Sequence, residues 1–332
     1  MANRLMIYGA TGYTGKLLSE VAVAQGLSPI LAGRDPARLA ELAGRLGGAE
    51  TRCFALDDAD AVRQGLAGVG CVIHAAGPFT ITGEPMIRAC IAGGVHYLDI
   101  TGEFSIFELA EALSDEAEQA GIMLMPGVGW DVVPSDCIAF HTAGRVASPQ
   151  ALRLALSHFG SVSRGSMKSG AYIVATGARA RRAGKVVSPQ DQPPQQFDFG
   201  DGPQTCVPMP MGDIITAWKS TRIPDIDVYF AIAEDGGFSA PTSIDEAPEG
   251  PSREERDAGR SRVIAEVTGA NGTIVRSMIE TSSGYAYTAD SGVEVARRVL
   301  AGDFKPGFQS PASAYGAQLA TSVGGSRITD LD

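Results

Sequence analysis

The chain has 332 residues, of which 44% are hydrophobic and 20% are charged. This length and composition exclude a single small module and a disordered tail, and they leave room for two domains. With 38 acidic against 27 basic side chains, the formal net charge is -11, and a surface of that sign repels phosphate backbones and anionic lipids. Neither nucleic acid nor a membrane is therefore expected as a partner.

The chain shows no apolar run near 18 residues, and its start, MANRLMIYGATG, lacks the basic region and cleavage site of a secretory signal. We therefore expect a cytoplasmic protein. The five cysteines are widely spaced and form no CxxC pair, so we expect neither a disulfide framework nor a zinc site. The histidines show no metal-ligand spacing, and no metal is predicted.

Short apolar runs alternate with amphipathic stretches from residue 4 to about residue 127, which is typical of a parallel sheet built from βαβ units. Six strands are expected, ending at Gly9, Gly33, Leu56, Gly77, Gly102 and Gly127. The predicted fold class is therefore α/β, with a Rossmann-type doubly wound parallel sheet and a second α/β domain built on a mixed sheet.

The most informative segment is GATGYTG, residues 9–15, which follows the first expected strand and opens the first expected helix. Its glycines permit a tight turn and bring backbone N–H groups close to a pyrophosphate at the positive end of the helix. This arrangement favours dinucleotide binding over a merely structural turn. The expected cofactor-binding residues here are Gly9, Thr11, Gly12, Tyr13, Thr14 and Gly15.

The choice of cofactor depends on AGRDPARL, residues 32–39, at the end of the second strand, where an NAD site normally presents a carboxylate to the ribose. Here Gly33 leaves room, Arg34 can pair with a 2′-phosphate, and Arg38 follows one helical turn later. This favours NADP, that is NADPH as the reductant, over NAD and over a flavin. Asp35 beside Arg34 keeps NAD as the alternative.

The next two strand ends also carry expected cofactor contacts. Asp57 is placed to meet the adenine amino group, although Asp57 and Asp58 are equally suited to cap the following helix. The fourth strand runs into small residues that let the chain pass close to the nicotinamide ribose, before a proline ends the strand. These expected contacts are Ala76, Gly77, Pro78 and Phe79.

The pattern changes after residue 127. A helix is expected over residues 137–147, a strand over 151–160, a crossover into a helix over 165–184 and a strand over 223–233. Residues 186–213, rich in Pro, Gln and Gly, predict a long loop or flap, and residues 236–255 a second irregular segment. Asn271-Gly272 predicts a hairpin between strands 261–267 and 273–280, and a last helix spans 292–302.

Several motifs together resemble the saccharopine dehydrogenase-like NADP-binding oxidoreductases. They are GATGYTG at 9–15, AAGPF at 75–79, HYLDITGE at 96–103, PGVGWDVVPSD at 126–136, IPDIDVYF at 223–230 and VARRVLAGDFKPGFQSPASAYG at 295–316. The family includes trans-acting enoyl reductases and is distantly similar to saccharopine reductase and homospermidine synthase. The resemblance implies a nucleotide domain at 1–133, a substrate and dimerisation domain at 134–302, and a C-terminal segment at 303–332 that returns to the nucleotide domain.

The resemblance also implies that strand ends build the substrate cleft, which adds Thr101 and Gly102 to the expected cofactor contacts. Hydride transfer needs a proton source, and Glu103 and Asp131 are the predicted catalytic carboxylates. For Glu103 the alternative is a helix cap. Ser135 is expected to bond the nicotinamide carboxamide, or else to cap a helix.

Three further side chains are expected to contact substrate. Trp130 is placed to wall the pocket, with ordinary packing as the alternative, and Arg164 and Lys168 are the expected anchors for a substrate carboxylate or phosphate. The predicted function is an NADPH-dependent reductase, forming a homodimer, that acts on a C=N or C=C bond of a small or carrier-bound substrate. The alternative is an NADP-binding sensor or scaffold without turnover.

Overall fold

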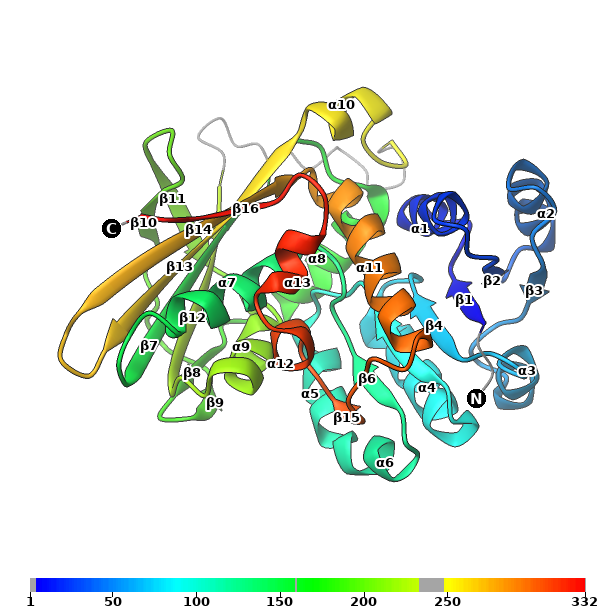
Figure 1. The fold of residues 1–332 in the computed structure, drawn as a ribbon, viewed down its shortest axis with the longest axis horizontal. Coiled ribbons are helices and arrows are strands. Elements are labelled where there is room, and N and C mark those ends of the chain that lie inside the picture. The colour runs from blue at the N-terminus through cyan, green and yellow to red at the C-terminus, as the bar shows by residue number, and fades with distance from the viewer. Residues whose placement is uncertain (1–3, 159, 233–247, 332) are drawn as a thin grey trace. The chain divides into compact units, whose positions relative to one another are not determined.

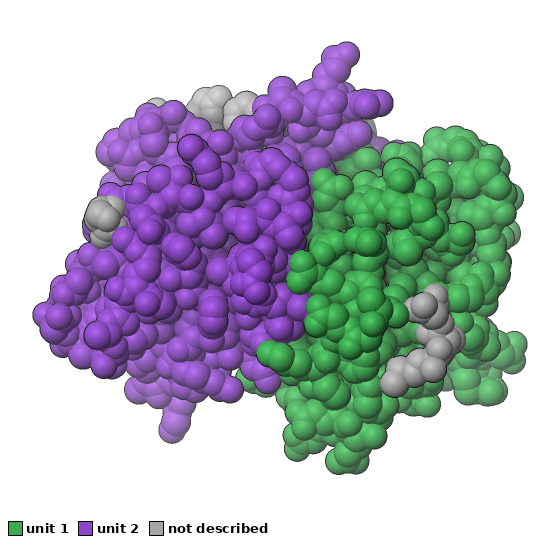
Figure 2. Space-filling view, viewed as in Figure 1, with its two compact units in different colours: residues 1–101, 105–129, 288–309 green, residues 102–104, 130–287, 310–332 purple. Residues whose placement is uncertain are grey.

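The computed structural model describes residues 4–158, 160–232 and 248–331, and the chain divides into two compact units (Figure 2). Unit 1 comprises residues 1–101, 105–129 and 288–309, and unit 2 comprises residues 102–104, 130–287 and 310–332. These bounds differ from the expected continuous ones, because residues 288–309 group with unit 1 while the rest of the C-terminal segment groups with unit 2. Within the described ranges, no helix is long and apolar enough to cross a membrane.

Unit 1 is built on a parallel sheet of seven strands in the part of the chain that the structure describes (Figure 1). The order is β15-β6-β5-β4-β1-β2-β3, so that the chain reverses its direction of travel across the sheet after β3. This is the doubly wound arrangement that the sequence predicts. The strands are β1 (Leu5–Tyr8), β2 (Ile30–Gly33), β3 (Thr51–Cys53), β4 (Cys71–His74), β5 (His96–Asp99), β6 (Met123–Met125) and β15 (Gly307–Phe308).

Most strands of unit 1 are short and largely apolar because both faces of a parallel sheet are normally covered, whereas the edge strand β3 is polar and partly exposed. Every residue of β1, β2, β4 and β5 is buried. The helices between and after them are α1 (Tyr13–Ala24), α2 (Pro36–Arg45), α3 (Ala59–Gly65), α4 (Phe79–Gly93), α5 (Phe104–Ala112), α6 (Ser114–Gln119) and α11 (Gly284–Leu300). The added strand β15 pairs with β6, which the Gly- and Ser-rich composition of the C-terminal tail does not predict.

Unit 2 is built on a mixed sheet that has nine strands among the described residues (Figure 1). Its order is β10-β11-β12-β7-β13-β14-β16, and β8 pairs with β12 and β9. The β12–β7 pair is parallel and its neighbours are antiparallel, as expected for a mixed sheet. The strands are β7 (Pro149–Ser157), β8 (Ala180–Arg182), β9 (Lys185–Val187), β10 (Gln195–Asp198), β11 (Pro203–Pro208), β12 (Asp225–Ala231), β13 (Arg260–Gly269), β14 (Ile274–Ser282) and β16 (Arg327–Asp330).

The helices of unit 2 pack against this sheet chiefly through α7 and α9, of which α7 contacts β7, β13 and β14, and α9 contacts β12. They are α7 (Val133–Ala143), α8 (Arg164–Ala175), α9 (Asp213–Thr221), α10 (Arg253–Ala258), α12 (Pro311–Tyr315) and α13 (Gln318–Ser322). The hairpin expected at Asn271-Gly272 joins β13 to β14, and Gly272 takes the positive φ of 82° that such a turn requires.

The prediction of a long loop over residues 186–213 is wrong. This segment contains part of β9 and the antiparallel pair β10–β11, and it ends where α9 begins. The strands form because Phe197 and Phe199 are buried in a cluster with Tyr229 and Ile264, a stabilisation that the Pro- and Gln-rich composition does not reveal. Most of the second irregular segment, expected over 236–255, lies outside the described residues, and its described end contains α10.

Candidate active site

The three glycines of the loop after β1 have different surroundings in unit 1. Gly9 has a φ of +83°, and a Cβ added there would lie 2.8 Å from the carbonyl carbon of Ala75. A Cβ on Gly15 would lie 2.1 Å from the carbonyl oxygen of Gly9, whereas a Cβ on Gly12 would come no closer than 3.3 Å to that atom. Gly9 and Gly15 are therefore required by packing. A Cβ on Gly12 would make this single tight contact, so the position is the least crowded of the three. A backbone without a side chain at this position fits the approach of a phosphate.

The loop also presents a helix start that is open to an anion. Gly12 is the N-cap of α1 and has no side chain, so the first N–H groups of the helix donate to no capping side chain. Arg38 donates from its guanidinium to the carbonyl oxygen of Thr11 at 3.0 Å. Arg38 therefore supports the loop directly. Thr14 lies in the first turn of α1, and so does Tyr13.

The end of β2 fits a 2′-phosphorylated cofactor. Arg34 is exposed, and the neighbouring Asp35 is the N-cap of α2. One carboxylate oxygen of Asp35 accepts the backbone N–H groups of Ala37 at 3.0 Å and Arg38 at 3.1 Å. The carboxylate on which the NAD alternative depends is thus engaged in capping its own helix, while the cationic Arg34 faces solvent.

Of the two roles that the sequence left open for Asp57 and Asp58, the structure assigns the helix cap to Asp58, and the adenine contact of Asp57 stays a prediction. Asp58 caps α3 and accepts the backbone N–H groups of Asp60 and Ala61, each at 3.0 Å. Asp57 is exposed, and its charge acts on Tyr8 together with that of Arg34. Burial raises the pKa of Tyr8 to about 12. The charged residues that follow β2 and β3 therefore both act electrostatically on Tyr8, the last residue of β1.

The residues after β4 fall into two groups. Gly77 is exposed, and Ala76 and Pro78 are half-buried, so they remain accessible to a ligand. Phe79 is only 5% exposed and lies edge-on to His74, with ring centroids 5.3 Å apart. Burial lowers the pKa of His74 to about 3, which keeps that ring neutral. Phe79 is therefore a core residue of unit 1.

Asp99, at the end of β5, is a polar core residue that the sequence analysis did not single out. Its carboxylate is fully buried and accepts the Tyr97 hydroxyl at 2.7 Å, the Thr101 N–H at 2.9 Å and the Gly127 N–H at 2.8 Å. It therefore holds the chain after β5 against the chain after β6. Thr101 itself is 1% exposed, so its role in this structure is in the network of Asp99.

The two predicted catalytic carboxylates lie in unit 2. Glu103 is 2% exposed and accepts the hydroxyl of Ser169, on α8, at 2.7 Å. Asp131 is half-buried, and desolvation raises its pKa to about 6. Gly102 leaves space beside Asp131, since a Cβ added to Gly102 would lie 3.2 Å from a carboxylate oxygen of Asp131. Gly102 therefore lies directly beside the Asp131 carboxylate.

A third acid, Asp213, was missed by the sequence analysis because it lies within the segment expected to be a loop. It begins α9, is fully buried, and accepts the Ser135 hydroxyl at 2.5 Å. Its other carboxylate oxygen has no hydrogen-bond partner among the described residues. Burial, with added repulsion from Asp136 and Asp131, raises the pKa of Asp213 well above its usual value.

This bond changes the interpretation of Ser135. The residue is fully buried in the first turn of α7, and its hydroxyl is engaged with Asp213. The N-cap of α7 is Val132, which makes no side-chain cap bond. Ser135 is therefore not the cap of α7, and its hydroxyl joins α7 to α9. The contact with the nicotinamide carboxamide stays a prediction.

The expected substrate contacts also differ in exposure. Trp130 is 3% exposed, donates its indole N–H to Thr281 at 3.1 Å and packs edge-on to His158. This favours the packing interpretation of Trp130. Lys168 is exposed and Arg164 is half-buried, and both lie in the first half of α8, the helix that also carries Ser169.

Comparison with protein families gives a match to the first part of the chain. Residues 5–125, from the first residue of β1 to the last of β6, match the saccharopine dehydrogenase NADP binding domain. Over 161 residues the chain is 32% identical to a probable mitochondrial saccharopine dehydrogenase-like oxidoreductase of Arabidopsis thaliana, covering 44% of this chain and 36% of that protein. Over 150 residues it is 33% identical to a trans-acting enoyl reductase of Mycobacterium leprae, covering 43% and 36%.

These matches span about a third of the length of the curated relatives. Among solved structures, the apo saccharopine dehydrogenase (L-Glu forming) of Saccharomyces cerevisiae is similar over 99% of this chain and 100% of that chain, with a TM-score of 0.66 and 15% sequence identity. This likeness confirms the α/β fold with its parallel and mixed sheets.

Proposed function

We propose that the protein is an NADPH-dependent oxidoreductase that reduces a C=N or C=C bond, because residues 5–125 match the saccharopine dehydrogenase NADP binding domain. The family match carries the proposal. The open start of α1 and the exposed Arg34 support it, because together they suit a pyrophosphate and a 2′-phosphate. NADPH, when bound, supplies the hydride.

The reaction also requires a proton, and Asp131 is the best candidate donor. A general acid works best when its pKa lies near the working pH, and burial brings the pKa of Asp131 to about 6. Glu103 holds the Ser169 hydroxyl and is suited to orient a substrate group on that side. Asp213 accepts the Ser135 hydroxyl, and its raised pKa favours a second protonated carboxyl group in the same unit.

The substrate class is part of the proposal. A trans-acting enoyl reductase is among the sequence relatives, which supports testing reduction of a C=C bond in a carrier-bound or thioester substrate first. Cyclic imines and pairs of a keto acid with an amine test reduction of a C=N bond. A homodimer is the proposed assembly, and sedimentation of the purified chain measures it.

The experiment is NADPH oxidation across enoyl thioesters, cyclic imines and keto acid–amine pairs. With the substrate found, Asp131→Asn is expected to lower turnover by about a hundredfold while leaving NADPH affinity within about twofold, because the carboxylate acts on the substrate. Turnover of the unmodified enzyme should fall as the pH rises through about 6, since Asp131 must be protonated to donate. Asp257→Asn, at a residue whose side chain is 70% exposed, is the matched control.

Turnover that is unchanged in both Asp131→Asn and Glu103→Gln would contradict the assignment of these acids. Tight NADPH binding without oxidation on any substrate of the panel would instead favour the sensor alternative. The two outcomes differ in the unmodified protein, since the first requires measurable turnover and the second requires none.

A further inference from the structure

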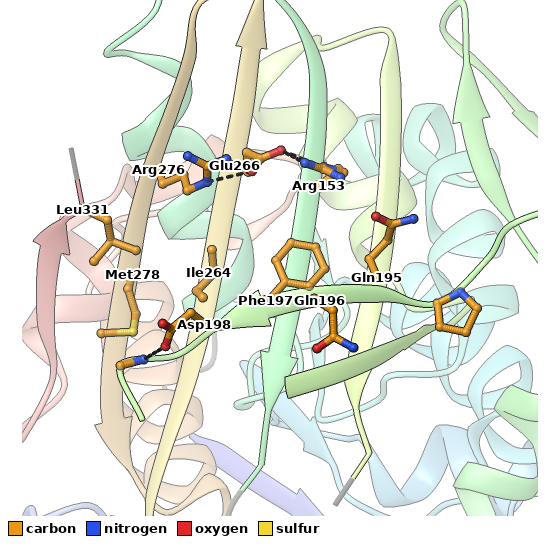
Figure 3. A pocket seen from close by; sticks show the side chains of 12 residues that line it. Arg153, Gln195, Gln196, Phe197, Asp198, Ile264, Glu266, Arg276, Met278 and Leu331 are labelled. Carbon is orange, nitrogen blue, oxygen red and sulfur yellow. Dashed lines mark hydrogen bonds and ion pairs between the residues drawn. The ribbon is translucent and has the colours of Figure 1, made fainter. Parts of the chain in front are cut away.

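Buried polar side chains differ between the two units in how completely they are hydrogen-bonded. In unit 2, β10 curls over the central strands and forms a cavity whose lining includes the buried Glu266 (Figure 3). Both carboxylate oxygens of Glu266 have a partner, since they accept the Nε atoms of Arg153 and Arg276, each at 2.7 Å. In unit 1, His74 at the end of β4 is 0% exposed, and its Nδ1 atom has no hydrogen-bond partner among the described residues. Such half-bonded buried rings are uncommon, so the partner of the other nitrogen indicates what the ring does.

That other nitrogen faces Thr82, which lies in the first turn of α4. The Nε2 atom of His74 is 3.0 Å from the hydroxyl oxygen of Thr82. The same hydroxyl oxygen lies 2.7 Å from the carbonyl oxygen of Ala76 and 3.1 Å from that of Pro78. Thr82 therefore joins the buried ring to the backbone of residues 75–78, which we call the β4–α4 loop.

The surroundings of Thr82 fix the direction of each hydrogen bond. A hydroxyl has one proton to donate, and the Pro78 carbonyl oxygen already accepts the backbone N–H groups of Ile81 and Thr82, both at 3.2 Å. The carbonyl oxygen of Ala76 is the nearer acceptor, so the Thr82 hydroxyl donates to it. His74 then donates to the Thr82 oxygen, which places the ring proton on Nε2. Burial lowers the pKa of His74 to about 3, so the ring is neutral and carries this single N–H proton.

The β4–α4 loop lies against the glycine loop that follows β1. A Cβ added to Gly9 would lie 2.8 Å from the carbonyl carbon of Ala75 and 2.8 Å from the backbone nitrogen of Ala76, so the two loops pack backbone to backbone. Gly77 is exposed, and Ala76 and Pro78 are half-buried. The loop that Thr82 holds is therefore accessible to a ligand and is in contact with the loop proposed to receive the pyrophosphate.

We propose that Thr82 is a positioning residue for the dinucleotide, because its hydroxyl, held by His74, fixes the Ala76 carbonyl group and with it the β4–α4 loop. This inference rests on the proposed binding of NADPH. Thr82 acts through the loop and makes no contact with the cofactor itself. Since the loop is proposed to meet the part that NADPH and NADH share, Thr82 affects the binding of both cofactors equally, whereas Arg34 distinguishes them.

The test is calorimetric binding of NADPH and NADH to the whole chain. Thr82→Val keeps the shape of the side chain but removes the hydroxyl, which leaves the Ala76 carbonyl group without this donor and the buried N–H of His74 without its acceptor. The variant is expected to weaken both cofactors by about tenfold, and to leave the ratio of the two affinities within about twofold of that of the unmodified protein.

Two further variants separate the hydroxyl from the fold. Thr82→Ser restores the hydroxyl and is expected to return both affinities to within about twofold of those of the unmodified protein. Thr80→Val is the matched control, because Thr80 is an exposed threonine of the same helix whose hydroxyl lies 3.2 Å from that of Ser105, and it is expected to leave both affinities unchanged. Chemical denaturation measures the stability of each variant.

Three results would overturn the positioning role. They are unchanged affinity in Thr82→Val, equal weakening in Thr82→Val and Thr82→Ser, and a loss confined to NADPH. A loss of stability with unchanged affinity belongs to the first, since a purely structural hydroxyl predicts it. If neither cofactor binds the unmodified protein, the proposed function and the positioning role fail together. If both cofactors bind and Thr82→Val does not weaken them, the positioning role alone fails.

The arrangement of the ring proton is tested without any cofactor. Nitrogen NMR distinguishes the two neutral tautomers of histidine, and the form with the proton on Nε2 is expected for His74 in the unmodified protein. His74→Phe, which keeps an aromatic ring at this position, identifies the signals of His74 by their loss. A proton on Nδ1 would overturn the proposal, because the Thr82 hydroxyl would then donate to His74 and would no longer hold the carbonyl group of Ala76.

Discussion

Each unit of the protein contains completely buried carboxylates, and Asp99 of unit 1 and Asp213 of unit 2 differ in the hydrogen bonds that they accept. In unit 1, Asp99 accepts three hydrogen bonds, one from a hydroxyl and two from backbone N–H groups. In unit 2, Asp213 accepts the Ser135 hydroxyl, and its second oxygen has no partner among the described residues. Both residues are 0% exposed and so are equally buried, but Asp99 accepts more hydrogen bonds than Asp213.

The difference separates Asp99, which is stabilised as an anion, from Asp213, which is stabilised when protonated. Three donors stabilise an ionised carboxylate and fix the backbone around it, whereas a buried carboxylate with few donors is stabilised by retaining its proton. The open polar groups of unit 1 lie instead at its surface, where Arg34 and the start of α1 meet solvent. Unit 1 thus presents its open polar groups to solvent, whereas the buried Asp213 of unit 2 is stabilised when it is protonated.

The largest expected effect is on stability and tests this comparison directly. Asp99→Ala leaves three buried donors without an acceptor and is expected to lower the free energy of unfolding by about 3 to 5 kcal/mol. The matched truncation Asp213→Ala removes one acceptor from Ser135, whose hydroxyl also lies 3.1 Å from the carbonyl oxygen of Val132, so a loss of at most about 1 kcal/mol is expected. Chemical denaturation at pH 7 measures both.

The pH dependence of Asp213→Ala sharpens the result. A raised pKa in the folded protein means that the unfolded chain releases this proton first, so the carboxyl makes the native protein less stable as the pH rises above its usual pKa. The stability of Asp213→Ala relative to the unmodified protein should therefore increase from pH 4 to pH 7. A constant difference across that range, or equal losses in the two variants, would remove the distinction between the two acids.

The second effect concerns the open loop of unit 1. Gly12→Val places a branched side chain where a phosphate must approach, and it is expected to weaken NADPH binding by about a hundredfold or more while the fold survives. Gly44→Val is the control, because a Cβ at Gly44 meets no atom within 4 Å and the residue is exposed on α2. Full NADPH affinity of Gly12→Val by calorimetry would place the phosphates elsewhere.

The smallest effect concerns the charge at the end of β2. NADPH is expected to bind about tenfold more tightly than NADH, equivalent to about 1.4 kcal/mol, and Arg34→Ala should remove most of that difference. Arg45→Ala, at an exposed arginine that ends the following helix α2, should preserve it. If the two cofactors bind the unmodified protein equally, Arg34 does not read the 2′-phosphate.

Unit 1 was predictable because its signals are local. Apart from β3, the strands from β1 to β6 are short and buried along their whole length, and the glycine loop follows β1 directly. The separation of Asp57 from Asp58 was not predictable, since adjacent identical residues are distinguished only by which one reaches the N–H groups of α3. Likewise Asp99 carries no local signal, because its donors come from residues up to 28 positions away along the chain.

Unit 2 was predictable only in part. Its long strands and the Asn271-Gly272 hairpin follow from alternation and turn chemistry, but β10 and β11 are stabilised by contacts with β12 and β13 that no local pattern encodes. Asp213 was missed for the same reason, since it was assigned to a loop. Glu103 and Asp131 were singled out because they follow strand ends, whereas the bond of Glu103 to Ser169 and the burial that raises the pKa of Asp131 depend on residues distant in the chain.

The sequence by itself determined the dinucleotide loop, the cationic residue after β2 and the order of the first six strands, because each depends on residues that are neighbours in the chain. Only the tertiary structure decided which carboxylates are buried, which of them lack donors and which strands curl to form a cavity. These properties depend on the loss of water around a group and on the partners that replace it. Such partners are brought together by packing, as Ser135 and Asp213 are across 78 positions of the chain.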